Sequence, residues 1–443
     1  CRSMAKISYA YQNPYNKGGN IMRIQIPYGK ETLEANVEDK RVVGVINSKL
    51  DTFSAGKGEH ELISDAMQNP IGTAPLCELA KGKSKVVIIA SDHTRPVPSK
   101  LIIPDMLREI RKTNPRVDIT ILIATGCHRS TRKEELYDKF GEELVKKEKI
   151  IIHDCDSTDM KYLGKLPSGG ELWINRLAAE ADLLIAEGFI EPHFFAGYSG
   201  GRKSVLPGIS RRDTIYANHC AEFIEDPNSR YGQIKDNLIH RDMIYAAHKA
   251  RLAYILNVVI NSAHKVIGAF AGDVELAHKE GVMFLESLCK AGRIPADIVV
   301  ASNNGYPMDQ NIYQTVKGMA AAEKTVKTGG VIIMAAACDD GCGGDAFYKI
   351  FSHAQSAQDV LDKILKVPRH RTQADQWQAQ IMARILSQHA VILISKCPEK
   401  MVKNLHIVPA FDFKDALAKA DRILGFNNGT ITFIPEGITS IIQ

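Results

Sequence analysis

Short apolar runs that alternate with longer charged stretches constrain the fold of this chain more than any other feature. Each run is rich in Val and Ile and nearly continuously apolar, which is typical of a strand buried on both faces of a parallel sheet. The stretches between the runs have helical spacing, and such alternation implies crossover connections and an open twisted sheet. The expected strands are 86–90, 119–124, 181–186, 255–260, 298–301, 331–335 and 390–395, and the expected helices are 104–113, 131–147, 274–291, 310–328 and 359–366.

The length of the chain and a restart of this pattern predict two domains. A single core rarely fills 443 residues, and the strand pattern begins again after the stretch 289–295. We therefore expect an N-terminal α/β domain over 22–290, which the segment 425–443 joins, and a C-terminal α/β domain over 291–424. Both sheets are expected to be mainly parallel.

The composition excludes several classes of protein. With 45% hydrophobic and 24% charged residues, the chain has ample material for a core, which excludes disorder. The net charge of +5 permits anionic small ligands but is no signature of nucleic-acid binding. No apolar run approaches the roughly 18 residues of a membrane span. Residues 1–21 lack the apolar core of a secretion signal and are interpreted as a leader or remnant before Met22, where strand-like sequence begins.

The nine cysteines favour a reducing compartment, so we expect a cytoplasmic protein. Their number is odd, their spacing is irregular and no C-x-x-C pair occurs, so neither a zinc ribbon nor a thioredoxin-type site is indicated. Cys338 and Cys342 form a C-x-x-x-C pair, which we interpret as two free thiols. The alternative is a zinc or redox site at these two residues.

Three of the predicted strands are each followed by a histidine with charged neighbours. The segment after the first strand reads SDHTRP, the second is followed by TGCHR with His128, and the third by EGFIEPH with His193. Because open α/β sheets bind ligands at the carboxyl ends of their strands, we expect these histidines to share one edge. Histidine titrates near neutrality, and two such bases on opposite faces of a carbon can invert it.

The segment HFFAGYSGGRKS over 193–204 is the densest cluster of unusual residues. It ends like a phosphate-binding loop, but Arg202 stands where that pattern requires glycine. The glycine-rich backbone beside Arg202 and Lys203 still predicts an anion cradle. Lys203 is either a point charge on a phosphate or a covalent nucleophile. A helix that Ser210 is expected to cap leads to His219, a candidate ligand of a soft or borderline metal.

A third polar cluster follows the strand expected at 298–301. Gln314 and Lys317 are three residues apart on a predicted helix and share a face, with Tyr313 beside them. We interpret this face as a polar tip directed across a cleft, and a solvated helix face is the alternative. The fingerprint G-x-G-x-x-G does not follow any strand, so an ordinary nicotinamide site is not indicated. These residues predict an enzyme that acts on a small anionic substrate with an anionic cofactor.

Five of these runs, taken in order, closely resemble motifs of the nickel-dependent lactate racemases. They are ASDHTRPVPS, ATGCHR, EGFIEPHFFAGYSGGRKSVLPGI, ANH and NGYPMDQNIYQTVKGM, and the resemblance extends from about Met22 to the C-terminus. It implies an isomerase with two α/β domains, an active site in the cleft between them and a nickel pincer nucleotide. This cofactor is a pyridinium-3-thioamide-5-thiocarboxylic acid mononucleotide in which two sulfurs and a ring carbon bind the nickel.

The resemblance also assigns roles to individual residues. Lys203 matches the lysine that is linked covalently to the cofactor, and His219 matches the protein ligand of the nickel. His128 and His193 match the two acid/base histidines. The other residues expected to contact substrate or cofactor are Asp92, Thr94, Arg95, Gly200, Gly201, Arg202, Tyr313, Gln314 and Lys317.

The implied reaction is the interconversion of D- and L-lactate. One histidine takes the hydroxyl proton while the α-hydrogen leaves as hydride, and pyruvate forms transiently. Pyruvate then receives hydride on its other face, and the second histidine acts on the other enantiomer. The implied partners are lactate and the enzymes that build the cofactor. Ser130, Pro192 and Cys342 depart from the family pattern, which leaves a racemase or epimerase of another 2-hydroxy acid as an alternative. A non-catalytic phosphate-binding protein that uses the glycine loop is a further one.

Overall fold

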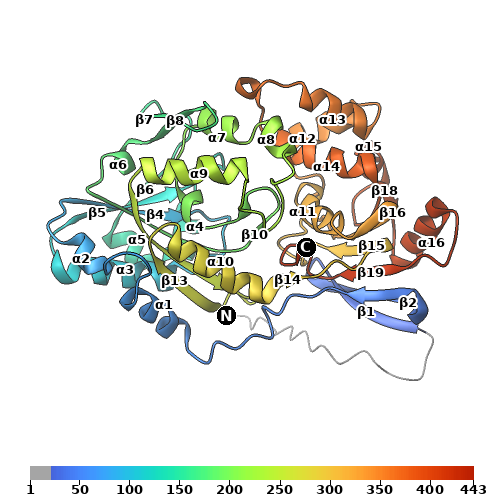
Figure 1. Ribbon diagram of the computed structural model, residues 1–443, viewed down its shortest axis with the longest axis horizontal. Helices are drawn as coiled ribbons and strands as arrows, with labels where there is room; N and C mark the ends of the chain where they lie inside the picture. The colour runs from blue at the N-terminus through green and yellow to red at the C-terminus, as the bar shows by residue number, and fades with distance from the viewer. Residues whose placement is uncertain (1–20) are drawn as a thin grey trace. The chain divides into compact units, whose positions relative to one another are not determined.

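The computed structural model describes residues 21–443, which form two compact units (Figure 1). Unit 1 contains residues 21–46, 293–353 and 385–437, and unit 2 contains Asn47–Gly292, Ala354–Arg384 and Ile438–Gln443. Apart from Ile21, which begins a strand, the expected leader lies outside the described residues.

Unit 2 is built on a six-stranded sheet with the strand order β13-β12-β9-β4-β5-β6. Neighbouring strands are parallel except for β12 and β13, which are antiparallel. The four central strands are buried along most of their length, as the apolar runs predict. The strands are β4 (Lys85–Ser91), β5 (Asp118–Ala124), β6 (Lys149–Ile152), β9 (Leu183–Phe189), β12 (Leu252–Ile260) and β13 (Val266–Gly272).

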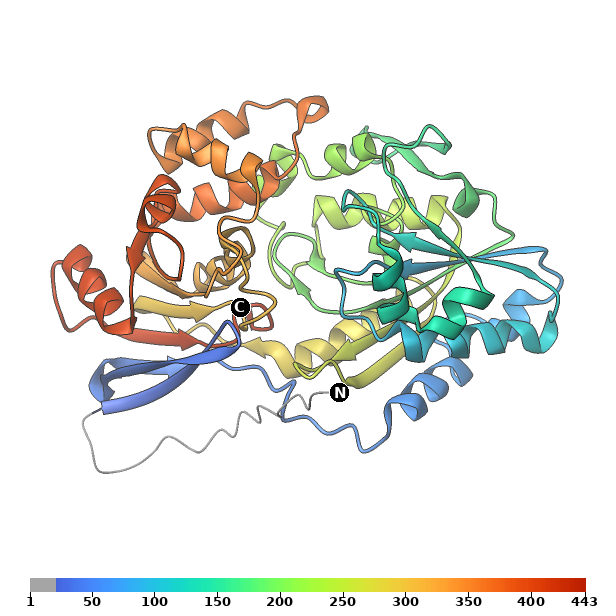
Figure 2. The ribbon, with the colours of Figure 1, turned by 180° about the vertical axis from the view of Figure 1, so that it is seen from behind.

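Helices cover both faces of this sheet. Seen from opposite sides, α9 and α10 lie on one face and α3 to α5 on the other (Figures 1 and 2). Val258 and Val259, adjacent in β12, point into two different apolar clusters, because successive side chains of a strand alternate between faces. The helices are α1 (Glu59–Gln68), α2 (Leu76–Ala80), α3 (Ser99–Thr113), α4 (Lys133–Phe140), α5 (Glu142–Lys147), α9 (Leu238–Lys249) and α10 (Leu276–Cys289).

Smaller elements complete unit 2. The helix expected over 131–147 is interrupted at Gly141, whose φ of +85° lies outside the helical region. The remaining elements are β7 (Met160–Lys165), β8 (Glu171–Asn175), α6 (Arg176–Ala179), β10 (Pro192–His193), β11 (Gly197–Tyr198), η2 (Gly201–Ser204), α7 (Arg212–Asn218), α8 (Ala221–Glu225), β14 (Lys290–Ala291), α13 (Ala357–Leu365), η3 (Arg369–Arg371) and β20 (Ile441–Ile442). Helix α14 spans Gln376–Gln388.

Unit 1 contains a second six-stranded sheet, whose strands are all parallel and have the order β18-β17-β16-β15-β19-β3. The hairpin of β1 and β2 and the helix α16 pack in one apolar cluster against it. Its elements are β1 (Ile21–Tyr28), β2 (Glu31–Glu38), η1 (Asp39–Arg41), β3 (Val42–Val45), β15 (Ala296–Ser302), α11 (Ile312–Ala322), β16 (Val326–Ala335), α12 (Asp345–Ser352), β17 (Ala390–Ile394), α15 (Glu399–Asn404), β18 (Val408–Ala410), α16 (Phe413–Leu424) and β19 (Ile431–Ile434).

The two units differ from the predicted domains at three places. The N-terminal stretch before residue 47 belongs to unit 1, because β3 pairs with β19. Only 438–443 of the expected returning segment belongs to unit 2, where β20 pairs with β14. The segment Ala354–Arg384 also belongs to unit 2. Strand pairing between distant segments accounts for the first two differences, and a local apolar pattern does not contain that information.

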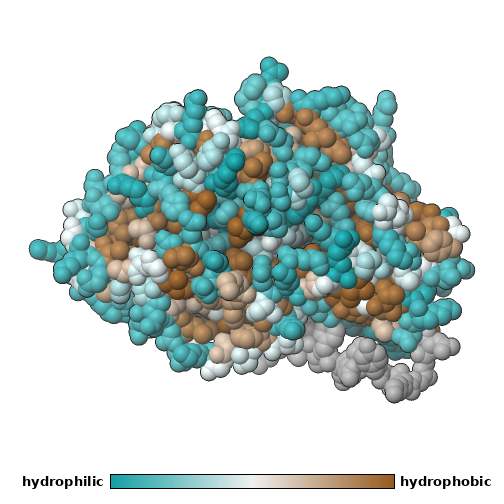
Figure 3. Space-filling view, viewed as in Figure 1, coloured by the Kyte–Doolittle hydropathy of each residue, from teal (hydrophilic) through white to brown (hydrophobic). Residues whose placement is uncertain are grey.

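The surface carries no continuous apolar band on the face that Figure 3 shows, where hydrophobic residues form separate groups among hydrophilic ones. Within residues 21–443, no helix is long and apolar enough to span a membrane.

Candidate active site

Three neighbouring strands of unit 2 deliver the predicted histidines to one edge of the sheet. Strand β4 pairs in parallel with both β5 and β9, so the carboxyl ends of all three lie together. His93 follows β4, His128 follows β5 and His193 follows β9. The predicted placement of the histidines at a common edge is therefore observed.

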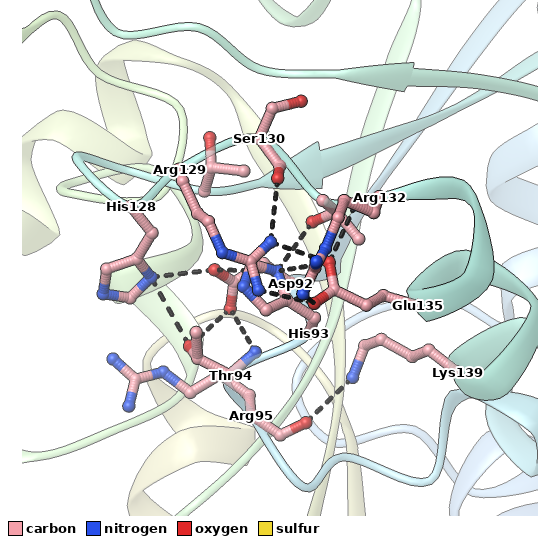
Figure 4. A network of polar contacts seen from close by, with 12 residues as sticks. Asp92, His93, Thr94, Arg95, His128, Arg129, Ser130, Arg132, Glu135 and Lys139 are labelled. Carbon is pink, nitrogen blue, oxygen red and sulfur yellow. Dashed lines mark hydrogen bonds and ion pairs between the residues drawn. The ribbon is translucent and has the colours of Figure 1, made fainter. Parts of the chain in front are cut away.

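His128 and Asp92 form a hydrogen-bonded pair at this edge (Figure 4). The distance from His128 Nδ1 to Asp92 Oδ2 is 2.8 Å, and the Asp92 side chain is only 1% exposed. Thr94 Oγ1 donates to the other carboxylate oxygen at 2.7 Å. Because a carboxylate accepts, Nδ1 of His128 carries the proton, and Nε2 is left as a proton acceptor.

The charge of Asp92 is stabilised by its neighbours. Burial raises the pKa of this carboxyl group, but the hydrogen bond and charge of His128, the hydrogen bond of Thr94 and the charge of Arg95 outweigh it, so the pKa is lowered. Asp92 is therefore ionised at neutral pH and fixes the tautomer of His128. The guanidinium of Arg95 and the ring of His128 extend to the same side of the network (Figure 4).

Two charged residues that sequence reasoning missed support this loop, the half-buried Lys139 and the buried Glu187. Lys139 Nζ donates to the carbonyl of Arg95 at 3.0 Å. Glu187 accepts the backbone N–H of Ser91 at 2.9 Å and the hydroxyl of Ser99 at 3.0 Å. Burial lowers the pKa of Lys139 and raises that of Glu187. A glutamate that ends an apolar strand was the available signal for Glu187.

The glycine loop around Lys203 forms a tight turn held by the protein itself. Gly200 has a φ of +82°, a conformation that favours glycine. The N–H of Gly201 donates to Asn257 Oδ1 at 2.7 Å, and the N–H of Lys203 donates to the carbonyl of Gly200 at 3.2 Å. These two amides are therefore engaged within the chain rather than arranged as an anion cradle. Asn257 was missed, although an asparagine inside an apolar strand is a recognisable signal.

Arg202 points into the protein rather than toward a ligand. Its side chain is fully buried and donates to the carbonyls of Ala196 at 2.9 Å and Gly200 at 3.2 Å. It also contacts His278 at 2.9 Å and His240 at 3.0 Å. The observed contacts of Arg202 organise the glycine loop, in contrast to the anion-binding role expected from the sequence.

The ring of Phe195 brings together three of the predicted site residues. The centroid of the Phe195 ring lies 4.5 Å from the ring centroid of His193 and 5.2 Å from that of His219. Nζ of Lys203 lies 5.9 Å from the Phe195 centroid. His193 belongs to β10, His219 directly follows α7, and Lys203 belongs to η2. Phe195 was not predicted, although paired aromatics between a histidine and a glycine loop mark the position.

Hydrogen bonds fix the protonation sites of His193 and His219. Nδ1 of His193 accepts the N–H of Ala196 at 3.2 Å, so the proton of the neutral ring lies on Nε2. Nδ1 of His219 lies 3.1 Å from the carbonyl of Ile215 and donates to it, which leaves Nε2 unprotonated. Burial and then the charge of Lys203 lower the pKa of His219 to about 3. A neutral imidazole held in this way suits a metal ligand.

His219 follows directly on α7, but the helix begins differently from expectation. Its N-cap is Arg211, and the hydroxyl of Ser210 donates to the carbonyl of Val205 at 2.8 Å. The predicted capping by Ser210 was wrong, because this hydroxyl closes the preceding turn instead.

Trp377 also contacts His219 and was missed by sequence reasoning. The two rings lie 5.2 Å apart in an edge-on arrangement. Trp377 belongs to the segment Ala354–Arg384, which packs with unit 2 although it is distant in sequence. The only sequence feature that pointed to Trp377 was the rarity of tryptophan, of which the chain contains two.

The third predicted cluster lies on the first turns of α11 in unit 1. Asn311 caps this helix by accepting the N–H of Gln314 at 3.0 Å. Tyr313, Gln314 and Lys317 are all partly exposed. Oε1 of Gln314 is buried and has no hydrogen-bond partner among the described residues. A buried acceptor of this kind is suited to a ligand donor.

The alternative zinc site gains no support from the described part of the chain. Cys338 and Cys342 are free thiols there. Within residues 21–443, only Asp154, Cys155 and Asp156 bring three ligand atoms of metal-binding type within 4.8 Å of one another.

Comparisons with known proteins decide the family. The lactate racemase N-terminal domain matches residues 28–232, and the lactate racemase C-terminal domain matches residues 291–442. Over 425 residues, the chain is 52% identical to the lactate racemase of Thermoanaerobacterium thermosaccharolyticum, with 96% of this chain and 100% of that protein covered. The chain belongs to the lactate racemase family.

Two further lactate racemase comparisons agree with this result. The lactate racemase of Lactiplantibacillus plantarum is 48% identical over 425 residues, with the same coverage of both chains. The structure of the lactate racemase apoprotein from T. thermosaccharolyticum superimposes with a TM-score of 0.92 and covers 95% of this chain and 100% of that one. The α/β class with mainly parallel sheets is confirmed, and this lactate racemase family member is an enzyme of the isomerase class.

Proposed function

We propose that this protein interconverts D- and L-lactate through transient pyruvate, with a nickel pincer nucleotide bound covalently to Lys203. The observation that carries the proposal is the gathering of Lys203, His193 and His219 around one phenylalanine ring. The hydrogen-bonded pair of His128 and Asp92 lies at the same edge of the sheet as His193. The names of the two similar enzymes support lactate as the substrate.

The residues around Phe195 fit this cofactor. His219 offers an unprotonated Nε2 on a buried neutral ring, as a ligand of nickel must. Lys203 lies close enough to lower the pKa of His219 by its charge, so one group can contact both residues. When bound, the cofactor supplies the acceptor and donor of the hydride from the α-carbon.

The residues of the chain provide the proton chemistry and the anchor. Nε2 of His128 takes the hydroxyl proton of one enantiomer, while Asp92 stabilises the imidazolium that forms. His193 is proposed to serve the other face of the carbon. In the structure its Nε2 carries the proton, so the ring must take the tautomer with the proton on Nδ1 before Nε2 can act as a base. Arg95 anchors the substrate carboxylate, since a guanidinium can bind it with two hydrogen bonds. Gln314 and Lys317 are also proposed to contact the substrate.

The proposal also includes Thr94, Tyr313 and the two loop glycines, Gly200 and Gly201, among the residues that support the cofactor. A cytoplasmic location and the participation of cofactor-building enzymes remain predictions.

Chiral analysis of D-lactate incubated with the protein tests the proposal directly. The protein is produced together with the cofactor-building enzymes and nickel, and the covalent adduct is verified by mass. We expect L-lactate to appear, and we expect both the adduct and the activity to disappear in Lys203→Ala. An unchanged adduct mass in that variant contradicts the assignment of Lys203. Absence of L-lactate from protein that carries nickel and adduct indicates another 2-hydroxy acid as substrate.

A further inference from the structure

We propose that Cys127 and Cys155 form a dithiol site that reacts with hydroperoxides, and that the resulting disulfide displaces His128. The site is distinct from the residues that bind substrate or cofactor above. Its formation does not depend on the reaction catalysed, whereas its effect on turnover rests on the proposed function.

The sheet topology places the two cysteines opposite one another. Strands β5 and β6 are parallel neighbours, with Ile123 paired to Ile152, and the cysteines follow four and three residues later. The N–H of His153 donates to the carbonyl of Ile123 at 3.0 Å, and the hydroxyl of Thr125 donates to the carbonyl of His153 at 2.7 Å. These bonds hold the two turns together, and Cys127 and Cys155 line the same cavity.

A cavity opens onto both thiols. It has a volume of about 380 Å³ and is lined by residues that include Cys127, His128, Cys155 and Arg212. Cys127 is partly exposed, whereas Cys155 is buried. A small oxidant that enters this cavity therefore lies against the residues that carry both sulfurs.

The surrounding charges make the two thiols unequal. The interaction with the Cys127 thiol lowers the pKa of Cys155. Burial opposes this shift and the charge of Arg212 adds to it, while the interaction with Cys155 and burial raise the pKa of Cys127. Arg212 is held in place by an ion pair with Asp156 at 2.6 Å, and its backbone N–H donates to the carbonyl of Cys155 at 3.1 Å. Cys155 is the nucleophile and Cys127 is the resolving thiol.

The oxidation balances with a hydroperoxide as the only co-reactant. The Cys155 thiolate attacks the terminal peroxide oxygen, the O–O bond breaks, and the protonated leaving oxygen departs as water or an alcohol. Cys155 is then a sulfenic acid. The sulfur of Cys127 attacks the Cys155 sulfur, the S–O bond breaks, and the thiol proton leaves with the hydroxyl group as water. Two thiols are oxidised to one disulfide while one peroxide is reduced.

Disulfide formation changes the position of His128 because this residue directly follows Cys127. A disulfide requires a sulfur–sulfur distance of about 2.0 Å, shorter than any contact between thiols. The turn is tied on its other side, since the N–H of Gly126 donates to the carbonyl of Gly208 at 2.9 Å. Drawing Cys127 toward Cys155 therefore rotates the turn and alters the contact of 2.8 Å between His128 and Asp92.

The chain offers a matched control in a second thiol pair. The thiol of Cys397 donates to the backbone carbonyl of Cys338 at 3.5 Å, and the two cysteines follow neighbouring parallel strands, β16 and β17. They belong to unit 1, and neither is adjacent in sequence to a proposed catalytic residue. Oxidation of this second pair is not expected to alter His128.

The test treats the reduced holoenzyme with hydrogen peroxide and maps disulfides by peptide mass after blocking free thiols. We expect a cross-link between Cys127 and Cys155, a loss of turnover on the order of tenfold to 100-fold, and recovery with dithiothreitol. The Cys155→Ser and Cys127→Ser variants are expected to form no such cross-link and to retain turnover. Cys397→Ser is expected to lose turnover like the unsubstituted protein.

A second readout keeps the inference independent of the reaction. Ethoxycarbonylation of His128 by diethyl pyrocarbonate is followed by peptide mass. Its rate is expected to change several-fold when the protein is oxidised, and to stay unchanged in Cys155→Ser. If the untreated protein is inactive on lactate but oxidation still changes the rate of His128 modification, the proposed function fails. The inference about the disulfide between Cys127 and Cys155 then still holds. Absence of the cross-link, an unchanged His128 rate, or equal loss of turnover in Cys155→Ser overturns the inference.

Discussion

At the scale of single residues, the pairing of His128 with Asp92 determines what the histidine can do. The buried carboxylate holds the proton on Nδ1, so the partly exposed ring presents Nε2 as a base. Asp92 keeps its charge because His128, Thr94 and Arg95 together outweigh the cost of its burial. The proton acceptor is thus created by a neighbour that need not contact the substrate.

Asp92→Asn tests this arrangement. The amide of asparagine can donate to Nδ1 and thereby favour the tautomer with the proton on Nε2, which cannot act as a base. We expect turnover to fall on the order of 100-fold or more while the covalent adduct forms normally. Steady-state rates with D- and L-lactate and the intact mass provide the measurement. Asp138→Asn on the exposed face of α4 is the control, and equal rates in the two variants would contradict the role of Asp92.

At the scale of elements, the glycine loop is shaped by what lies against it. A side chain at Gly200 would place its Cβ 2.7 Å from Asn257 Oδ1 and 2.9 Å from the carbonyl of Phe189. Asn257 also accepts the N–H of Gly201, so this residue of β12 both binds the loop and leaves no room for a side chain at Gly200. The position of Lys203 therefore depends on a strand distant in sequence.

Gly200→Ala is expected to disturb this match. We expect a loss of stability of about 1–3 kcal/mol from the left-handed backbone, and in addition a loss of adduct formation because the clash moves Lys203. Gly82→Ala is a matched control, because Gly82 has a φ of +72° but no neighbour within 4 Å of the added Cβ. Denaturant unfolding and adduct mass distinguish the two effects. Full adduct formation in Gly200→Ala would show that the contact with Asn257 does not position Lys203.

At the scale of the whole molecule, buried histidines couple stability to pH. Burial lowers the pKa of His153 to about 4, and burial with the charge of Arg202 lowers that of His240 to about 3. The pKa of His278 is also lowered by burial. Their pKa values in the unfolded chain are near the ordinary value of 6.5. The unfolded state therefore binds more protons than the folded state below that pH.

The sign of this linkage gives a prediction. The stabilising contribution of the neutral rings is complete above about pH 6.5 and is lost progressively as the pH falls toward 4 and then 3. We expect the midpoint of thermal unfolding to fall between about pH 7 and pH 5. The dependence should persist in His248→Gln, since His248 is exposed. A midpoint that is constant over this range would contradict the prediction.

The sequence by itself determined the features that depend on local spacing. Apolar runs gave strands such as β4 and β5, and the histidine that follows each run was thereby assigned to one sheet edge. Parallel strands must end together, so the placement of His128 and His193 required no knowledge of distant contacts. The motif around Lys203 was recognisable for the same reason, because its residues are consecutive.

The tertiary structure alone decided which distant segments meet. Pairing of β3 with β19 assigned the N-terminal stretch to unit 1, and Trp377 reached the ring of His219 from a segment more than a hundred residues away. The inward direction of Arg202 and the cavity that Cys127 and Cys155 share also depend on packing. Periodicity records whether a side chain is buried, whereas the identity of its neighbours is set by strand order and chain crossings.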